Sequence, residues 1–142
     1  MTLACVISDR ADAQIETLVM PGQVIEGHAE YEEECSSCHA KFKRAEQRSL
    51  CLDCHEDVAA DVTAGSGFHG LSAEARDTNC ATCHTDHEGR SADIVQLDED
   101  SFDHDLTDFP LLGKHGETEC VECHETDSKH RDAPSDCFAC HE

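Results

Sequence analysis

The sequence has few of the side chains that ordinarily fill a protein core. Its 142 residues include no tryptophan, one tyrosine and five phenylalanines. The hydrophobic fraction is 38%, a figure that counts eleven cysteines. Ten of these fall in one repeated motif, and without them roughly 31% of the chain remains for an ordinary core. A domain this poor in large apolar residues needs cross-links or cofactors to be stable.

Basic residues are also scarce. The chain has 10 lysines and arginines against 32 acidic residues, for a net charge of −22. Nucleic acid is excluded as a natural partner, because its binding depends on basic contacts that release counterions. A bare anionic bilayer is excluded for the same reason. A basic patch on a partner protein is the natural complement, although acidity alone also keeps a protein soluble.

No stretch approaches the length of a membrane span. Residues 2–7 (TLACVI) are apolar, and ADA before Gln14 resembles a signal cleavage site, but a basic start and a longer apolar region are missing. We interpret residues 1–17 as an N-terminal arm or the remnant of a clipped secretory signal, and residues 18–142 as one domain. Cys5 is the only cysteine outside the motif. It weakly resembles a lipoprotein cysteine, but the usual leucine is out of place, and we interpret it as a spare thiol.

The chain does contain five copies of Cys-x-x-Cys-His, where random placement would give about 0.06. The motif predicts covalent attachment of a haem: two cysteines bond the vinyl groups, and the histidine, on the same face of a helix, becomes the proximal ligand of the iron. The five sites pair Cys35 and Cys38 with His39, Cys51 and Cys54 with His55, Cys80 and Cys83 with His84, Cys120 and Cys123 with His124, and Cys137 and Cys140 with His141.

Two other interpretations of the motif fit less well. Structural zinc takes four ligands, commonly from two Cys-x-x-Cys corners; five corners do not pair evenly, and zinc gives no reason for a histidine after each second cysteine. A thioredoxin-like dithiol needs one reactive pair within a βαβ unit, and the chain lacks strand patterning. Five haems on so short a chain leave no room for separate protein cores, so we expect the haems themselves to form the core.

Six histidines lie outside the motifs: His28, His69, His87, His104, His115 and His130. An iron with two histidine ligands needs one distal histidine, so five are required and six are present. His87 follows proximal His84 by three residues, too close to reach the same iron, and we expect it to serve another haem. No histidine lies between the first two motifs. The distal ligand of the first haem must therefore be His28 or a residue well downstream.

The predicted fold is mainly irregular with short α-helices, organised around stacked haems. Ser49 is a candidate N-cap for a helix that runs through the second motif and ends near Gly65. Thr78 and Thr118 are candidate N-caps before the third and fourth motifs. Residues 88–113 show neither a helical nor a strand period, and we expect a long loop that crosses haem faces.

Several segments resemble multihaem cytochromes of the c3/c7-like families: MPGQVIEGHAEYEEECSSCH (20–39), GFHG (67–70), CATCHTDHEG (80–89) and FDHDLTDFPLLGKHGETECVECH (102–124). The resemblance covers roughly residues 18–142. It implies low-spin haems with two histidine ligands in a closely stacked chain. It also assigns the distal ligands to His28, His69, His87, His104 and His115, with His130 as the spare. Related sequences often continue with further haem segments beyond the position where this one ends.

The resemblance implies an extracytoplasmic electron carrier, periplasmic or extracellular in a bacterium, with five c-type haems and no catalytic residue. Exposed haems among many carboxylates predict low reduction potentials. Expected partners are other cytochromes and a quinol-linked membrane donor or a terminal acceptor, docking through basic patches. Two alternatives stay open: a subunit of a polymerising cytochrome filament, and a multihaem oxidoreductase with one open haem.

Overall fold

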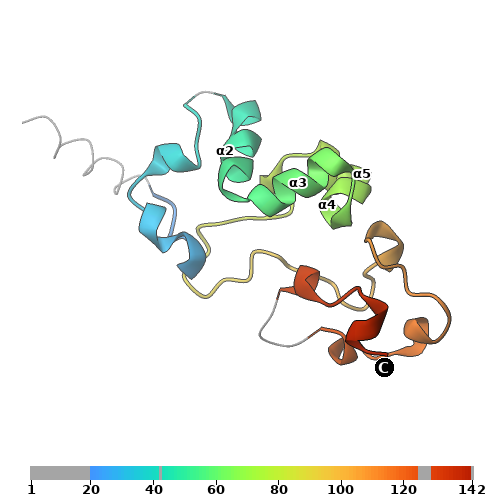
Figure 1. Cartoon of the computed structure of the whole chain (residues 1–142). Coiled ribbons are helices and arrows are strands. Elements are labelled where there is room, and N and C mark those ends of the chain that lie inside the picture. Colours follow the sequence, from blue (N-terminus) through green and yellow to red (C-terminus); the bar gives the residue numbers. More distant parts are fainter. Residues whose placement is uncertain (1–19, 42, 125–128, 142) are drawn as a thin grey trace, which may run out of the picture. The chain divides into compact units, whose positions relative to one another are not determined.

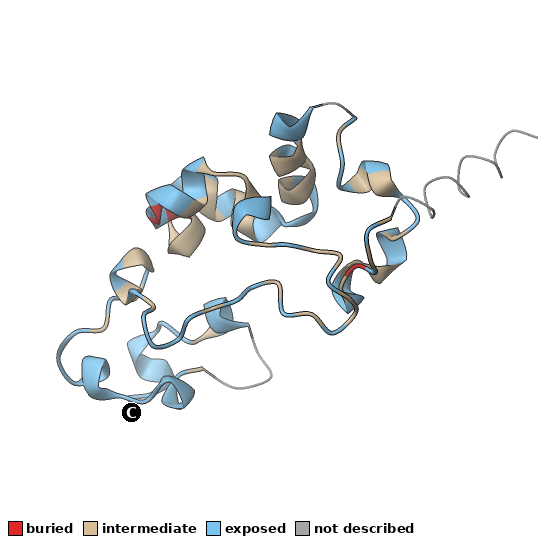
Figure 2. Cartoon of the chain, turned by 180° about the vertical axis from the view of Figure 1, so that it is seen from behind, coloured by how far each residue is buried: buried red, intermediate tan, exposed pale blue. Residues whose placement is uncertain are grey.

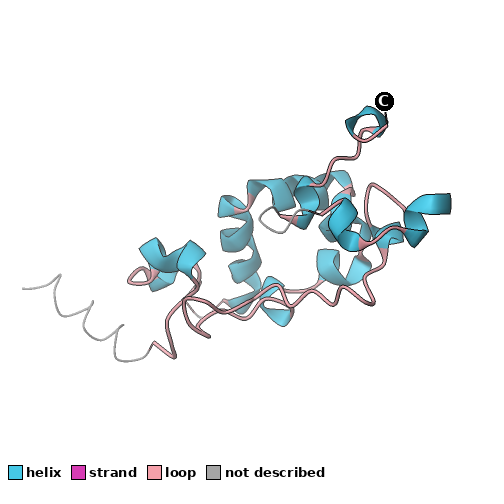
Figure 3. Ribbon diagram, turned by 90° about the horizontal axis from the view of Figure 1, so that it is seen from below, coloured by secondary structure: helices cyan, strands magenta, loops and turns pink. Residues whose placement is uncertain are grey.

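The computed structural model describes residues 20–41, 43–124 and 129–141 (Figure 1). These residues form short helices and turns joined by irregular segments, with no strand among them (Figure 3). The predicted fold class is thereby confirmed. The α-helices are α2 (Gln47–Cys54), α3 (Glu56–Ala64), α4 (Gly67–Leu71) and α5 (Ala73–Asp77). The 3₁₀ turns are η1 (Glu26–Tyr31), η2 (Cys35–Ser37), η3 (Arg44–Glu46), η4 (Cys80–Thr82), η5 (His104–Leu106), η6 (Gly113–Glu117), η7 (Cys120–Glu122), η8 (His130–Asp132) and η9 (Cys137–Ala139).

The helix predicted from Ser49 is in fact two helices. The chain leaves the helical conformation at His55, with φ −90° and ψ 64°, and α3 begins at the next residue. Ser49 lies inside α2 and donates a hydrogen bond to the carbonyl of Glu46, so its assignment as an N-cap was wrong. The predicted end is confirmed: α3 stops at Gly65, whose φ of 69° is a left-handed conformation that glycine adopts without steric cost.

The two threonine caps were each wrong by one residue. Thr78 closes α5 by donating to the carbonyl of Glu74, and Asn79 instead caps the turn of the third motif by accepting from Ala81 N–H. Thr118 donates to the carbonyl of Lys114 and precedes the N-cap position of η7. Both hydroxyls bond backward into the preceding turn, a known alternative to capping the following one. The long loop predicted over 88–113 is confirmed apart from the single turn η5 and the start of η6.

The chain divides into two compact units. The first comprises residues up to Cys54 together with Asn79–Gln96. In it, segment 22–26 lies beside segment 89–90, joined by backbone hydrogen bonds from Gly89 N–H to the Gln23 carbonyl and from Glu26 N–H to the Arg90 carbonyl. The unit thus brings the residues before the first motif next to those that follow the third.

The second unit comprises residues His55–Thr78 and those from Leu97 onward. Helix α4 packs against α3 and α5 there, and Gly70 allows a close approach to α3: a Cβ on this residue would lie 2.3 Å from the Asp61 carbonyl oxygen. The N–H of Gly67 donates to Asp108, and Arg131 forms an ion pair with Asp61 at 3.0 Å. These contacts attach the later loops to the helices.

Neither unit has an ordinary hydrophobic core in its described residues. Among the described residues, Val24 is the one buried large apolar residue, and none has a fully buried side chain. Most of the described ribbon is coloured as exposed or intermediate (Figure 2). Phe138 and Val121, both inside Cys-x-x-Cys-His motifs, are 85% and 68% exposed. Apolar burial is the main force that stabilises a folded chain, so this chain needs another apolar body to pack against.

In the described part of the chain, no helix is long and apolar enough to cross a membrane. The arm predicted over residues 1–17, with Cys5, lies outside the described residues, and the domain predicted over 18–142 stays a prediction.

Candidate functional site

Four of the five Cys-x-x-Cys-His motifs share one backbone geometry. In each, the carbonyl of the first cysteine accepts from the N–H of the second cysteine and from the N–H of the histidine. For the first motif these distances are 3.3 Å (Cys38) and 2.8 Å (His39) to Cys35, and the third, fourth and fifth motifs repeat them closely. The single turn places both thiols and the imidazole on adjoining positions of one face. The second motif differs, since its cysteines lie in α2 and His55 follows the end of that helix.

Two of the thiols are in surroundings that oppose ionisation. Burial, followed by the neighbouring Cys80 thiol, raises the pKa of Cys51 to about 11. Burial also raises the pKa of Cys38, and Asp86 adds to the effect. Cysteines that act as redox nucleophiles have the opposite shift, because the thiolate is the reactive form. These directions disfavour the dithiol interpretation of the motif. The described residues also contain no cluster of three or more ligand side chains arranged to hold a bare metal ion.

Three proximal histidines each face one of the spare histidines. The ring centroids are 6.1 Å apart for His39 and His87, with the ring planes only 19° from parallel. They are 6.2 Å apart for His104 and His124, and 5.9 Å for His115 and His141. Each pair lies within one of the two units.

These separations fit a metal between the rings. Two imidazoles that ligate one ion from opposite sides have centroids about 6 Å apart, because each metal–nitrogen bond is about 2 Å and each centroid lies about 1 Å behind its nitrogen. Ring pairs in direct contact span about 4.5–7 Å, so these separations are compatible with a metal between the rings and with direct contact alike. The donor set, two imidazoles with two adjacent thiols for covalent attachment, is that of a c-type haem.

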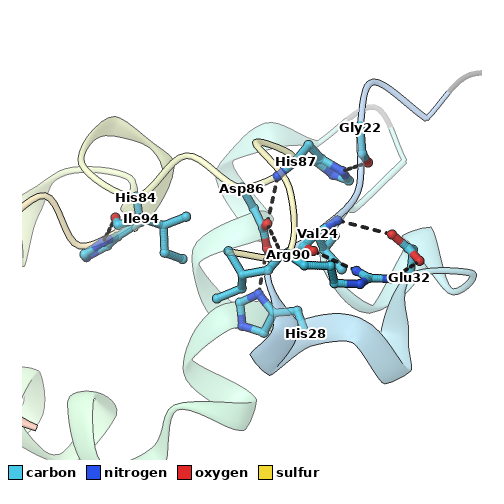
Figure 4. A network of polar contacts seen from close by, with 10 residues as sticks. Gly22, Val24, His28, Glu32, His84, Asp86, His87, Arg90 and Ile94 are labelled. Carbon is cyan, nitrogen blue, oxygen red and sulfur yellow. Dashed lines mark hydrogen bonds and ion pairs between the residues drawn. The ribbon is translucent and has the colours of Figure 1, made fainter. Parts of the chain in front are cut away.

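Hydrogen bonds also fix which ring nitrogen is available in three histidines (Figure 4). Nδ1 of His28 lies 2.7 Å from Asp86 Oδ2, Nδ1 of His84 2.9 Å from the Ile94 carbonyl, and Nδ1 of His87 2.9 Å from the Gly22 carbonyl. These oxygens only accept, so Nδ1 carries the proton and Nε2 of the neutral ring keeps its lone pair. This is the usual state of a metal-binding histidine, whose other nitrogen donates to a carboxylate or carbonyl.

The carboxylate of Asp86 accepts hydrogen bonds from two of the spare histidines, from the ring of His28 and from the backbone of His87. Its Oδ1 accepts from the N–H groups of His87, at 2.7 Å, and Ile25, at 2.9 Å, while Oδ2 accepts from His28. Burial opposes ionisation of Asp86, but the hydrogen bonds, first that of His28, outweigh it and lower the pKa of the carboxyl. His87 has φ 71°, a left-handed conformation that costs a non-glycine residue about 1 kcal/mol or more. Asp86 and Gly22 stabilise this conformation by bonding the His87 backbone and ring.

Arg90 joins the segment before the first motif to the segment after the third. Its guanidinium forms an ion pair with Glu32 and donates to the Val24 carbonyl at 2.7 Å, while Val24 N–H donates to Glu32 at 3.3 Å (Figure 4). The hydrogen bond from Arg90 is the main reason that the pKa of Glu32 is lowered. The triangle fixes the segment before the first motif against the segment after the third.

The sixth spare histidine, His130, also lies near a proximal histidine. Its ring centroid is 5.1 Å from that of His124, about 1 Å closer than the His104 ring on the same histidine. Its Nε2 lies 4.0 Å from a Glu99 carboxylate oxygen. Burial, and then the neighbouring His130 and His104, lower the pKa of His124. Both histidines therefore lie near His124, and of the two spacings that of His104 is the one that would leave room for an iron between the rings.

The other four histidines of the predicted sites are His55, His84, His28 and His69, the last two of which remain candidate distal ligands. All four make interactions within the chain.

Several residues that shape the site had no signal in the sequence. Asp86 is one acidic residue among 32, and its position between His84 and His87 was the only hint. Gly22 and Ile94 act through backbone carbonyls, which any residue supplies. The ion pair of Arg90 with Glu32 joins positions 58 residues apart. Only the folded chain brings these groups to the histidines.

Repeated attachment turns, facing histidines and the near absence of an apolar core are together typical of multihaem c-type cytochromes. The family model for cytochrome c3 matches residues 27–99, just over half of the chain and including the first three motifs. The chain belongs to the cytochrome c3 family, whose members are multihaem electron-transfer proteins, typically periplasmic. No curated protein and no solved structure matches it.

Proposed function

We propose that the protein carries electrons along five covalently attached c-type haems outside the cytoplasm, each iron held by two histidines. Membership of the cytochrome c3 family supports multihaem electron transfer. A total of five haems requires that the fourth and fifth motifs also bind haem, and these motifs lie beyond the residues that the family model matches. The observation that supports a haem at each of these two motifs is the pairing of histidine rings about 6 Å apart. Two of the three such pairs involve His124 and His141, the histidines of the last two motifs.

The pairs supply a ligand assignment. His87 would be the distal ligand of the haem held at His39, His104 of the haem held at His124, and His115 of the haem held at His141. His28 and His69 stay candidate distal ligands, as the sequence predicts. His130 is the spare, because its ring is too close to His124 for an iron between them.

The haem supplies one-electron chemistry between ferric and ferrous iron, and the chain determines spacing, ligation and potential. Two imidazoles per iron leave no position for a substrate, which favours a carrier over an enzyme. Carboxylates around exposed sites favour the ferric state and low potentials. The net charge of −22 favours redox partners that dock through basic patches.

A spectroelectrochemical titration of the holoprotein tests this function. We expect only low-spin spectra in both oxidation states and five one-electron steps at low potential. A high-spin ferric signal in the unaltered protein would instead support the oxidoreductase alternative. A filament subunit would grow in size with protein concentration, whereas a strict monomer would refute that alternative.

A further inference from the structure

Among the three histidines whose Nδ1 is hydrogen-bonded, His28 has a charged acceptor, the carboxylate of Asp86. The Nδ1–H groups of His84 and His87 donate to neutral backbone carbonyls, whereas that of His28 donates to a carboxylate at 2.7 Å. The carboxylate is fixed in place by two backbone N–H groups, those of Ile25 and His87. Its side chain is only 24% exposed, and that of His28 only 30%, so water competes weakly for the bond.

A charged acceptor changes what the imidazole does at its other nitrogen. A carboxylate draws the Nδ1 proton toward itself, increases the electron density of the ring and makes Nε2 a stronger donor to a metal. A stronger donor stabilises ferric iron more than ferrous iron, because the ferric ion carries the higher charge. The potential of that iron therefore falls.

We propose that Asp86 is a positioning residue that orients His28 through Nδ1 and lowers the reduction potential of the haem that His28 ligates. This inference rests on the proposed function, since it needs His28 as a distal ligand. It goes beyond that function by assigning the control of one potential to one carboxylate. It also explains why the same carboxylate bonds the His87 backbone: the rigid anchor keeps Oδ2 directed at His28.

Asp86→Asn is the direct test, because the amide is nearly isosteric and neutral. Removal of the hydrogen-bond partner of a metal-binding histidine weakens metal binding about 10- to 100-fold. We expect at least about a tenfold loss in the preference of His28 for ferric iron, which for a one-electron couple is a rise of about 59 mV in one midpoint potential. The other four potentials should change much less, and the spectrum should stay low-spin. Asp86→Glu keeps the charge and should restore a potential closer to that of the unaltered protein.

Asp93→Asn is the matched control. Asp93 lies in the same unit and accepts from the backbone N–H groups of Val95 and Gln96, so the change removes one charge without touching a histidine. A general charge effect would also be screened by salt, whereas a shift through the ligand would persist. If Asp86→Asn shifts no potential more than Asp93→Asn does, or if its shift disappears at high salt, the proposal is wrong.

A measurement on the unaltered holoprotein keeps the proposal testable if Asp86→Asn fails to assemble. In the diamagnetic reduced protein, the Nδ1 proton of His28 should resonate further downfield than those of His84 and His87, because its acceptor is charged. A His28 proton upfield of both would overturn the proposal. Failure of the proposed function is distinguishable, because it would appear earlier, as a low haem content or a high-spin haem in the unaltered protein.

Discussion

Gly22 is a position where the structure predicts a large effect of one added methyl group. A Cβ on Gly22 would lie 2.2 Å from the His87 carbonyl oxygen, where ordinary contact begins near 3.4 Å. The neighbour is backbone, held by the Asp86 hydrogen bond to His87 N–H, so the two segments must separate by about 1 Å. The bond from His87 Nδ1 to the Gly22 carbonyl, 2.9 Å long, would then exceed hydrogen-bonding range.

The expected cost of Gly22→Ala combines about 1–3 kcal/mol of overpacking with about 1 kcal/mol for the lost hydrogen bond, or about 2–4 kcal/mol of unfolding free energy. Denaturant unfolding of the holoprotein measures this loss. Under the proposed ligation, the spectrum should also gain a high-spin fraction, because the His87 ring would withdraw from the iron. Gly27→Ala is the control, because its Cβ would meet only Ile25 Cδ1, at 3.8 Å. Equal stability of the two variants would refute the packing argument.

Three further predictions concern ligation, acid stability and docking. His104→Ala should convert one haem to high-spin while His130→Ala leaves every haem low-spin; the reverse result would exchange their roles. Arg90→Gln should destabilise the protein at neutral pH. The pKa of Glu32 is lowered in the folded state, so its stabilisation is present above the unfolded carboxyl pKa and is lost as the pH falls, and unfolding curves of the two proteins should converge below about pH 4. Electron exchange with a basic redox protein should slow as ionic strength rises, since attraction to a charge of −22 is screened; no salt dependence would argue against electrostatic docking.

The sequence was most informative where the chemistry is local. Five Cys-x-x-Cys-His motifs stand far above chance, and each is completed within five residues, so counting was enough to predict the attachment sites. The spacing of His84 and His87 also excluded a shared iron, and the structure brings His87 to His39 instead. The irregular fold followed from the missing core residues and is confirmed.

The sequence was least informative where one hydrogen-bonding group has several possible partners of similar energy. A hydroxyl can cap the turn that follows it or bond back to the turn before it, and both Thr78 and Thr118 do the second. The break at His55 had no glycine or proline to mark it. The acceptors for the imidazole Nδ1 groups of His28 and His87 are remote in sequence, at Asp86 and Gly22, and no local pattern identifies them.

Under the proposed function, every Cys-x-x-Cys-His motif of this chain holds one covalent haem. Intact-mass measurement of the purified holoprotein, with a pyridine haemochrome assay on the same sample, tests it most directly. We predict the polypeptide mass plus five haems and a haem-to-protein ratio of five. A mass equal to that of the bare chain, or a ratio of three that leaves the motifs at Cys120 and Cys137 unmodified, would contradict it.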